Sequence, residues 1–241
     1  LDVLGRLQKQ NGLTIHCMQW NRRGTLLALG HQAGVVTIVG EDDIVESLPL
    51  VHTASSGMDM SDVVCLQWLD NDVAADVVDD DNGGGGGGGD GGGGDDSSTS
   101  HDNSSLLAAG CEHGEIRIFR VDDIERTMVL CAVLRTHKDA VRCLQWRPRL
   151  PAVLLSGSSD TTVQVWNVAA AMSEQQAMLT AVASGERDFD ASAVAFGADK
   201  QSFVANFRGH AGHVLAVAWS PSDGDLAFSG SDDQSLRMWR P

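Results

Sequence analysis

Residues 17–20 read CMQW, residues 65–68 and 143–146 read CLQW, and residues 216–219 read AVAW. One motif therefore stands four times in a chain of 241 residues, and each copy closes a short apolar run. Self-similarity at intervals of tens of residues is typical of repeat architectures. The fold is therefore expected to consist of one small unit that is used several times.

Three further apolar runs accompany each copy of the motif. A second run ends in Gly and lies at residues 26–30, 106–110, 153–157 and 226–230. A third run follows a tight turn and lies at residues 35–39, 115–119, 163–166 and 236–239. An extended candidate precedes each first run, at residues 3–7, 44–51, 128–134 and 202–207. Short runs rich in Val, Ile, Leu and Trp between turn residues predict antiparallel strands joined by hairpins, so the unit has four strands.

Polar residues repeat at fixed spacing in the last two units. His137 precedes Asp160 by 23 residues, and Asp160 precedes Trp166 by six. The same two intervals separate His210, Asp233 and Trp239. This set resembles the WD40 repeat, whose four-stranded units form the blades of a β-propeller. The resemblance implies an all-β fold in which these six residues form structural hydrogen-bond networks inside their blades.

The resemblance predicts four blades, as an arc of a larger, seven-bladed propeller. The predicted blades lie at about 1–40, 41–120, 121–168 and 202–241. Residues 70–104 are rich in Gly, Asp and Ser and are expected to be a disordered surface loop, because they offer too little apolar surface to order themselves. Residues 170–201 form a second insertion, between blades, whose Ala-, Met- and Gln-rich sequence favours a short helix. Residues 3–7 are a candidate strand to complete the last blade.

Composition excludes a chain that is disordered throughout, since 42% of its residues are hydrophobic. The formal net charge of −16 argues against a partner held by phosphate neutralisation. Most of that charge is local: residues 70–104 hold ten Asp and no Lys or Arg, and the remainder holds 23 acidic and 17 basic residues, a net charge of −6. No apolar run approaches the roughly 18 residues of a membrane helix, and no signal peptide opens the sequence, so we expect a soluble chain, cytoplasmic, nuclear or both.

The sequence favours a non-catalytic chain with no cofactor and no metal ion. His137 and Asp160 lie near Ser residues, as in a Ser-His-Asp triad, but the same set recurs in the last blade, which a structural role explains. The Cys residues of the repeated motif occupy equivalent positions in separate blades, which favours core packing over a shared metal site. The Gly-rich run lacks the flanking strand and helix that a dinucleotide-binding fingerprint needs.

Three stretches near the end of the chain are more specific than the WD40 class. Residues 206–210 read NFRGH, residues 217–221 read VAWSP and residues 229–233 read SGSDD. Together with VQVW at 163–166 and LALG at 27–30, they are similar to the closing four blades of the second propeller in the gem-associated protein five family, the WD-repeat Gemins of the SMN complex. The resemblance implies SMN-complex partners, recognition of small nuclear RNA and a role in spliceosomal snRNP assembly, with most RNA contacts made by parts of the family outside this chain.

Eight residues are expected to form the candidate binding face, because their two registers face the narrow end of a propeller, where ligands bind. They are Thr14 and Gln32, Asp62 and Glu112, Ala140 and Ser159, and His213 and Asp232. By the resemblance, Ala140 and Ser159 stand where the family has a Lys and a Tyr that contact RNA, and neither can do that work. Three of the eight are acidic and none is Lys or Arg, so the candidate binding face better suits a basic protein segment.

One cluster of basic residues contrasts with the acidic character of the candidate binding face. It contains Arg135, Lys138, Arg142, Arg147 and Arg149, with a single acidic residue, Asp139, among them. Such a group is able to contact phosphates, and it equally fits the solvated edge of a blade. The chain has no Tyr and only six Trp and six Phe, so platforms for stacking RNA bases are scarce.

Two functions remain open. The first is a non-catalytic WD40 module that acts in snRNP assembly and, through a longer parent protein, in small nuclear RNA binding. The second is a general WD40 scaffold that binds a basic peptide or partner protein on its acidic face. Hydrolase activity rests on the triad alone, which the repeat explains. Neither of the two functions involves a membrane.

Overall fold

The computed structural model describes residues 13–40, 50–52, 60–69, 104–122, 124–125, 127–148, 152–173, 176 and 202–241. Within these ranges fifteen strands form four antiparallel sheets, three of four strands and one of three. We name the sheets blade one to blade four in chain order. The strands are rich in Val, Ile, Leu and Trp, which fit a pleated, half-buried surface. The predicted all-β fold with four propeller-type blades is confirmed.

The strands of each blade pair in chain order. Blade one contains β1 (Ile15–Trp20), β2 (Leu26–His31), β3 (Val36–Gly40) and β4 (Leu50–His52), with a short 3-10 turn, η1 (Gln32–Gly34), between β2 and β3. Blade two contains β5 (Val63–Leu69), β6 (Ser104–Cys111), β7 (Glu115–Asp122) and β8 (Thr127–Arg135). Blade three contains β9 (Val141–Trp146), β10 (Val153–Ser158), β11 (Thr162–Asn167) and β12 (Phe203–Arg208). Blade four contains β13 (Val214–Trp219), β14 (Ala227–Ser231) and β15 (Leu236–Trp239).

The sheets are displaced by one strand from the predicted blades. The run expected to open the predicted blade at 41–120 becomes β4, which pairs with β3 of blade one and places Val51 opposite Thr37. In the same way β8 closes blade two on β7, and β12 closes blade three on β11. The physical reason is that the chain folds back on the free edge of the third strand before it crosses to the next blade. The period of the sequence is the same wherever the sheet boundary falls.

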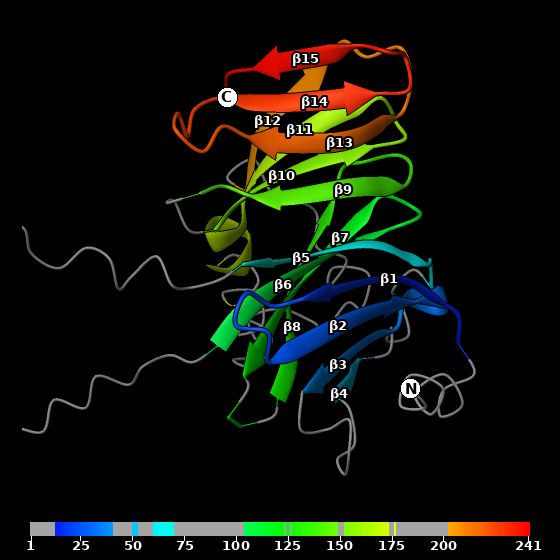
Figure 1. Cartoon of the computed structure of the whole chain (residues 1–241), viewed down its shortest axis with the longest axis vertical. Coiled ribbons are helices and arrows are strands. Elements are labelled where there is room, and N and C mark those ends of the chain that lie inside the picture. Colours follow the sequence, from blue (N-terminus) through cyan, green and yellow to red (C-terminus); the bar gives the residue numbers. More distant parts are fainter. Residues whose placement is uncertain are drawn as a thin grey trace, which may run out of the picture.

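The four blades stack one on the next, with their first strands side by side (Figure 1). β1 contacts β5, β5 contacts β9, and β9 contacts β13. Between blades two and three, Val141 and Trp146 of β9 share one apolar cluster with Ile116 and Ile118 of β7. Similar clusters fill the other two junctions. The core of this chain therefore lies mainly between its sheets.

In the described structure no neighbouring blade packs on the two outer faces of the stack. Trp20 of β1 is 46% exposed, whereas the corresponding Trp in each of the other three blades is at most 6% exposed. At the other end of the stack, Leu236 and Met238 of β15 are 74% and 63% exposed. Val163 and Val165 hold the corresponding places in blade three and are almost completely buried. Each outer face thus carries side chains that the inner blades bury.

Little of the two insertions falls within the described residues. The expected loop at 70–104 lies outside them, apart from Ser104, where β6 begins, and so does the candidate strand at 3–7. A short helical segment, residues 168–173, leads from blade three into the second insertion. The Asn167 side-chain oxygen accepts a hydrogen bond from the Ala170 backbone N–H at 3.1 Å and so caps this segment. No helix in the described part of the chain is long and apolar enough to cross a membrane.

Candidate functional site

The repeated motif joins each blade to the one before it. The Trp68 indole N–H donates to the Gln19 carbonyl oxygen at 3.0 Å, and the Trp68 backbone N–H donates to the Gln19 side-chain oxygen at 3.2 Å. The same indole-to-carbonyl bond recurs from Trp146 to Gln67 at 3.0 Å and from Trp219 to Gln145 at 3.3 Å. The Gln and Trp of the motif therefore form a seam of hydrogen bonds between neighbouring blades.

The Cys residues of the motif belong to this seam. Cys17 Sγ lies 3.5 Å from the Val63 carbonyl oxygen, and Cys65 Sγ lies 3.2 Å from the Val141 carbonyl oxygen. Burial raises the pKa of the Cys17 and Cys143 thiols to about 12, so both stay protonated. A neutral thiol is a poor nucleophile and a poor metal ligand. Among the described residues there is no group of three or more side chains that could hold a metal ion.

Blades three and four each contain a buried hydrogen-bond network. In blade three, His137 Nδ1 lies 2.9 Å from Asp160 Oδ2, and His137 Nε2 lies 2.8 Å from Ser156 Oγ. The Trp166 indole N–H donates to the same Ser156 oxygen at 2.9 Å. Blade four repeats these three distances at 3.0, 2.7 and 2.7 Å with His210, Asp233, Ser229 and Trp239. Every polar group named here has a partner, as a structural network requires.

The carboxyl of Asp160 is held in its charged form. Burial by itself raises its pKa, but hydrogen bonds from His137, the Thr162 hydroxyl and the Lys138 backbone N–H, with the charge of His137, outweigh burial and hold the pKa well below its usual range. A lowered folded-state pKa stabilises the fold above the unfolded-state pKa of about 3.9. The stabilisation is lost as the pH falls from there through the folded-state pKa.

We expect Asp160→Ala to lower the free energy of unfolding by about 1–3 kcal/mol at neutral pH, because it removes the carboxylate partner of the buried His137 ring and leaves only the Thr162 hydroxyl beside its Nδ1. Urea titrations at neutral pH and at several lower values measure this difference. The difference in unfolding free energy between the wild type and the variant should shrink below about pH 4, because the charged Asp160 carboxylate then stabilises the folded wild type less. Glu125→Ala, at an exposed turn, is the control. A difference that does not change with pH would contradict the role given to the carboxylate.

Blade two carries a buried ion triad in place of this network. The Arg117 side chain is fully buried, and its Nη2 and Nε lie 3.0 and 3.2 Å from Glu115 Oε2. The other carboxylate oxygen, Oε1, lies 2.7 Å from Arg135 Nη2. Arg117 Nη1 also donates to the Gly34 carbonyl oxygen of blade one at 2.9 Å. One carboxylate therefore serves two guanidinium groups, and one of these ties blade two to blade one.

The eight residues of the candidate binding face lie at one end of the blades, where each first strand begins and each second strand ends. In each blade, the later residue of the pair donates its backbone N–H to the carbonyl oxygen of the earlier one. The distances are 3.1 Å for Gln32 and Thr14, 2.9 Å for Glu112 and Asp62, 2.8 Å for Ser159 and Ala140, and 3.1 Å for Asp232 and His213. The structure therefore brings each predicted pair together, at equivalent places in four blades.

Two of the eight residues are not available to a ligand. Ala140 and Ser159 are 1% and 5% exposed. The Arg142 Nε–H group donates to the Ser159 hydroxyl at 2.8 Å, and His213 Nδ1 lies 2.8 Å from the Ser159 carbonyl oxygen. Because these two neighbouring side chains engage Ser159, the expectation that all eight residues are presented to a partner is corrected to six.

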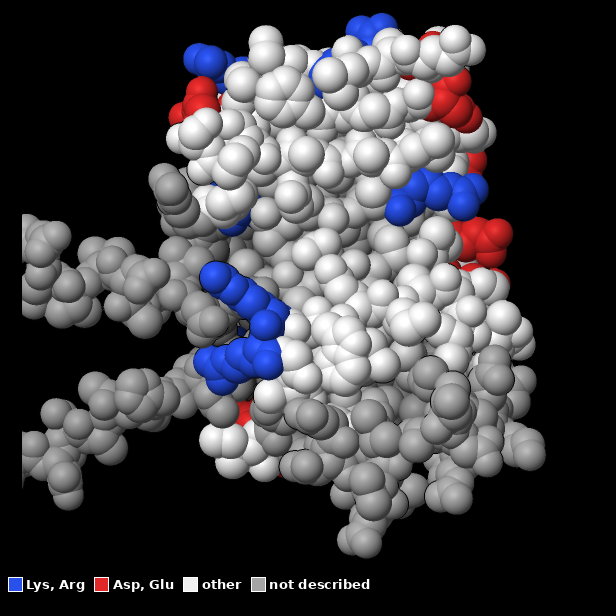
Figure 2. Space-filling view, in the orientation of Figure 1, with Lys and Arg blue, Asp and Glu red and all other residues white. Residues whose placement is uncertain are grey.

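Carboxylates remain on the candidate binding face in blades two and four. Asp62 is engaged locally: its Oδ1 accepts the Ala33 backbone N–H at 2.9 Å, and its Oδ2 lies 3.0 Å from His16 Nε2. Glu112 and Asp232 are exposed, and in the described part of the chain neither side chain has an ion-pair partner. Figures 1 and 2 show Asp and Glu gathered along the edge at which β9 and β13 begin, with a Lys or Arg side chain between them.

The predicted basic cluster does not form one patch. Arg142 lies near the start of β9 and Arg147 follows its end, so they are about 17 Å apart at roughly 3.3 Å per residue. Lys138 is exposed, and Arg149 lies outside the described residues. Ion pairs occupy two of the others, Arg135 with Glu115 and Arg147 with Asp225. The prediction of a shared phosphate site is corrected, because the cluster is split along a strand and partly neutralised.

Family models match the chain in three places. The model described as "WD domain, G-beta repeat" matches residues 128–167 and 201–240. The model described as "Anaphase-promoting complex subunit 4 WD40 domain" matches residues 2–71. The G-beta repeat starts on the outer strand of the preceding sheet, as the predicted blades do. With the four-bladed topology, these matches make this chain a WD40-repeat protein, a class that generally acts as a non-catalytic scaffold for other proteins.

Several known proteins share this class with the chain. Protein transport protein SEC31 of Ajellomyces capsulatus is 28% identical over 161 residues, which cover 57% of this chain and 12% of that protein. Striatin-3 of Homo sapiens is 33% identical over 106 residues, which cover 44% of this chain and 11% of the relative. A chain in the solved structure "Crystal Structure of Mitotic Checkpoint Complex" superposes with a TM-score of 0.58 at 18% identity, over 95% of this chain and 50% of that one.

The chain thus spans about an eighth or less of these two curated relatives, and none of the proteins named here is a Gemin. The comparisons support the WD40 class. They do not support the narrower resemblance to the gem-associated protein five family, and the predicted role in snRNP assembly stays untested.

Proposed function

We propose that this chain is a protein-interaction module whose candidate binding face holds a basic segment of a partner protein. The observation that carries the proposal is a pair of exposed carboxylates that have no ion-pair partner among the described residues. They are Glu112 on blade two and Asp232 on blade four, at equivalent places of the two blades. Carboxylates in this position attract Lys and Arg and repel phosphate. The segment has to be extended, because blade three lies between the two carboxylates.

Blade three has a different charge from blades two and four at this end. Arg142 lies over Ser159 and Lys138 is exposed at the same end of the blade. These two basic residues outnumber the one exposed acidic residue beside them, Asp139, so a basic segment is attracted more strongly at blades two and four than at blade three. This pattern fixes the spacing of the basic residues that a partner needs, and it distinguishes specific binding from attraction to a uniformly acidic surface.

The RNA role has weaker support on this face. Ala140 and Ser159, which correspond to the RNA-contacting positions of the resembled family, are buried, and the basic residues nearby are divided between two ends of β9. A segment of RNA would also meet Glu112 and Asp232. We therefore place the protein partner first, and let the experiment decide between the two.

We expect the double variant Glu112→Lys and Asp232→Lys to bind a fluorescein-labelled peptide of alternating Lys and Ser about tenfold more weakly than the wild type. Each exposed charge pair contributes only about 0.2–1 kcal/mol, and charge reversal adds repulsion to the lost attraction. Fluorescence anisotropy at low and high salt measures this, and the wild-type affinity should fall as salt rises.

Glu125→Lys is the matched control, since it makes the same change at the β7–β8 turn, at the opposite end of blade two. Peptide binding that is equal in the double variant and the control would overturn the proposal. The same titration is made with a labelled single-stranded RNA. If the wild type binds the RNA and not the peptide, the small nuclear RNA role replaces the protein partner.

A further inference from the structure

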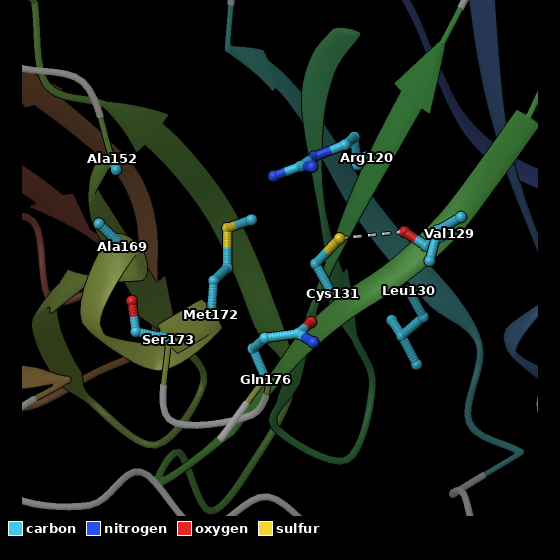
Figure 3. Close-up of a pocket in the computed structure, with 9 residues that line it drawn as sticks. All are labelled: Arg120, Val129, Leu130, Cys131, Ala152, Ala169, Met172, Ser173 and Gln176. Atoms are coloured by element: carbon cyan, nitrogen blue, oxygen red, sulfur yellow. Dashed lines mark hydrogen bonds between the residues drawn. The ribbon is translucent and has the colours of Figure 1, made fainter. Parts of the chain in front are cut away.

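A cleft of about 610 Å³ opens on the outer side of blades two and three (Figure 3). It lies toward the ends of β7 and β11 that are remote from the candidate binding face, because Arg120 and Val129 flank the β7–β8 turn. One wall is the outer part of blade two, and the other is the helical segment at residues 168–173. Neither the seam nor the hydrogen-bond networks described above use this cleft.

The helical wall is anchored from behind. Val168 and Ala171 belong to the apolar cluster between blades two and three and are 0% and 7% exposed. Helical periodicity then turns Ala169 and Ser173 to the exposed side, where they line the cleft (Figure 3). Met172 is half-buried: it packs on the edge of the same apolar cluster and also lines the cleft. The Asn167 cap fixes the start of the segment. This wall is therefore held in place by burial and needs no ligand to form it.

The opposite wall is the outermost strand of blade two. β8 pairs with β7 only, so in the described structure no strand is hydrogen-bonded to its other edge. β4 of blade one also contacts β8. Its pairing is irregular at the cleft: Ala132 faces Ile118 and Leu130 faces Phe119, which leaves Cys131 as an extra, bulged residue. Bulges re-aim side chains and are common beside binding sites. Burial raises the pKa of the Cys131 thiol, so it contributes a neutral, apolar contact.

Arg120 supplies the charge of the cleft. Its guanidinium group extends into the space between β8 and Met172 (Figure 3). Arg117 and Arg135 in the same blade are both paired with Glu115, whereas Arg120 has no ion-pair partner among the described residues. An unpaired guanidinium group above an apolar cleft is complementary to a carboxylate that carries apolar groups on either side.

We propose that this cleft binds a short segment of a partner protein in which one acidic side chain is flanked by aliphatic ones. The carboxylate pairs with Arg120, and the aliphatic side chains pack on the exposed Val129 and on Met172. The free edge of β8 offers backbone hydrogen bonds to an extended segment, as in strand addition. This second contact surface has the opposite charge preference to the candidate binding face, so one chain is able to hold two different partners or two segments of one partner.

The test uses the full chain and two labelled peptides, Leu-Glu-Leu-Leu and Leu-Gln-Leu-Leu. We expect the wild type to bind the Glu peptide about tenfold more tightly than the Gln peptide, because hydrogen bonds to a charged group are stronger than neutral ones. Arg120→Gln should remove this preference, and Arg120→Lys should keep part of it. Arg208→Gln, which removes an exposed Arg on β12, is the control and should change nothing.

A second variant tests the cleft itself. Ala169→Trp places a large side chain in the cleft from an exposed helical position, so it should abolish peptide binding while the melting temperature stays unchanged. Equal binding of both peptides, unchanged binding to Arg120→Gln, or unchanged binding to Ala169→Trp would each overturn the proposal, as would no binding at all. The variant Glu112→Lys with Asp232→Lys should bind the Glu peptide normally, so this result is independent of the proposed function.

Discussion

The Glu115→Ala variant is expected to unfold at a much lower urea concentration than the wild type. Arg117 is completely buried and Arg135 is largely so, and both guanidinium groups pair with this one carboxylate. Removal of the carboxylate leaves two positive charges together in a low-dielectric site. Breaking a buried ion pair from one side typically costs about 3–5 kcal/mol, which is a large part of the stability of a small domain.

Two further variants separate the buried charge from other causes. Glu112→Ala removes an exposed carboxylate three residues away and should change stability by no more than about 0.5 kcal/mol. The double variant Glu115→Leu and Arg117→Met replaces the charges by apolar side chains and should recover much of the loss. Circular dichroism during urea titration measures all three. A Glu115→Ala variant as stable as Glu112→Ala would show that the triad contributes little.

Trp146→Ala is expected to have the second large effect. Trp146 is buried in the apolar cluster between blades two and three, and its indole N–H donates to the Gln67 carbonyl oxygen. Truncation of a buried Trp typically costs about 3–5 kcal/mol, because it leaves a cavity. Here it also leaves the carbonyl group without its donor. The loss falls on the junction between blades, so the two sheets should separate more readily.

Trp20→Ala is the matched control for this prediction, since the two residues hold the same place in the same motif. Trp20 is 46% exposed on an outer face, where no blade is packed against it in the described structure. Replacement of Trp20 by Ala should lower the free energy of unfolding by about 1 kcal/mol or less, because the folded protein buries little of its apolar surface. Urea unfolding followed by circular dichroism measures both variants. Equal losses for Trp146→Ala and Trp20→Ala would contradict the seam between blades as the source of the stabilisation.

The strands could be predicted from the sequence because each is a local pattern. In blades one, three and four the repeated motif, the turn after it and the next apolar run lie within about twenty residues, and hairpins of this kind form between neighbours in the chain. In blade two the insertion at 70–104 separates the same two runs. The sheet boundaries could not be predicted in the same way. Whether β8 pairs with β7 or with β9 depends on which strand edge is free in three dimensions, and the spacing of a repeat carries no sign of that.

The seam was missed for a related reason. Alternation of side chains assigns Gln19, Gln67 and Gln145 to one face of a strand, but only the stacking of blades shows that the next Trp lies opposite. One signal was present: Gln recurs in three copies of the motif, and Ala218 replaces it in the fourth. A polar residue that recurs among apolar ones in a buried strand indicates a partner that repeats with it.

The sequence predicted where the residues of the candidate binding face lie, but it did not predict that two of them are buried. The four pairs occur where the repeat places them, because their register follows from the strand pairing. Burial of Ser159 depends on the side chains of Arg142 and His213, which come from another part of the same blade and from the next blade. The buried ion triad of blade two could not be predicted, because Glu115 and Arg117 lie two residues apart on a strand and their sequence fits a solvent-exposed ion pair equally well.

In the described structure no further blade packs on the outer faces of β1 and β15, and this determines how the stack comes apart. Each blade is held mainly by its neighbours, so the inner blades have two junctions and the terminal blades have one. Such an array behaves as a row of coupled units whose cooperativity passes only between adjacent members. Opening should therefore spread inward from Trp20 at one end and Met238 at the other, and amide hydrogens of blades two and three should exchange last. Any added blade would convert an end into an interior and slow that fraying.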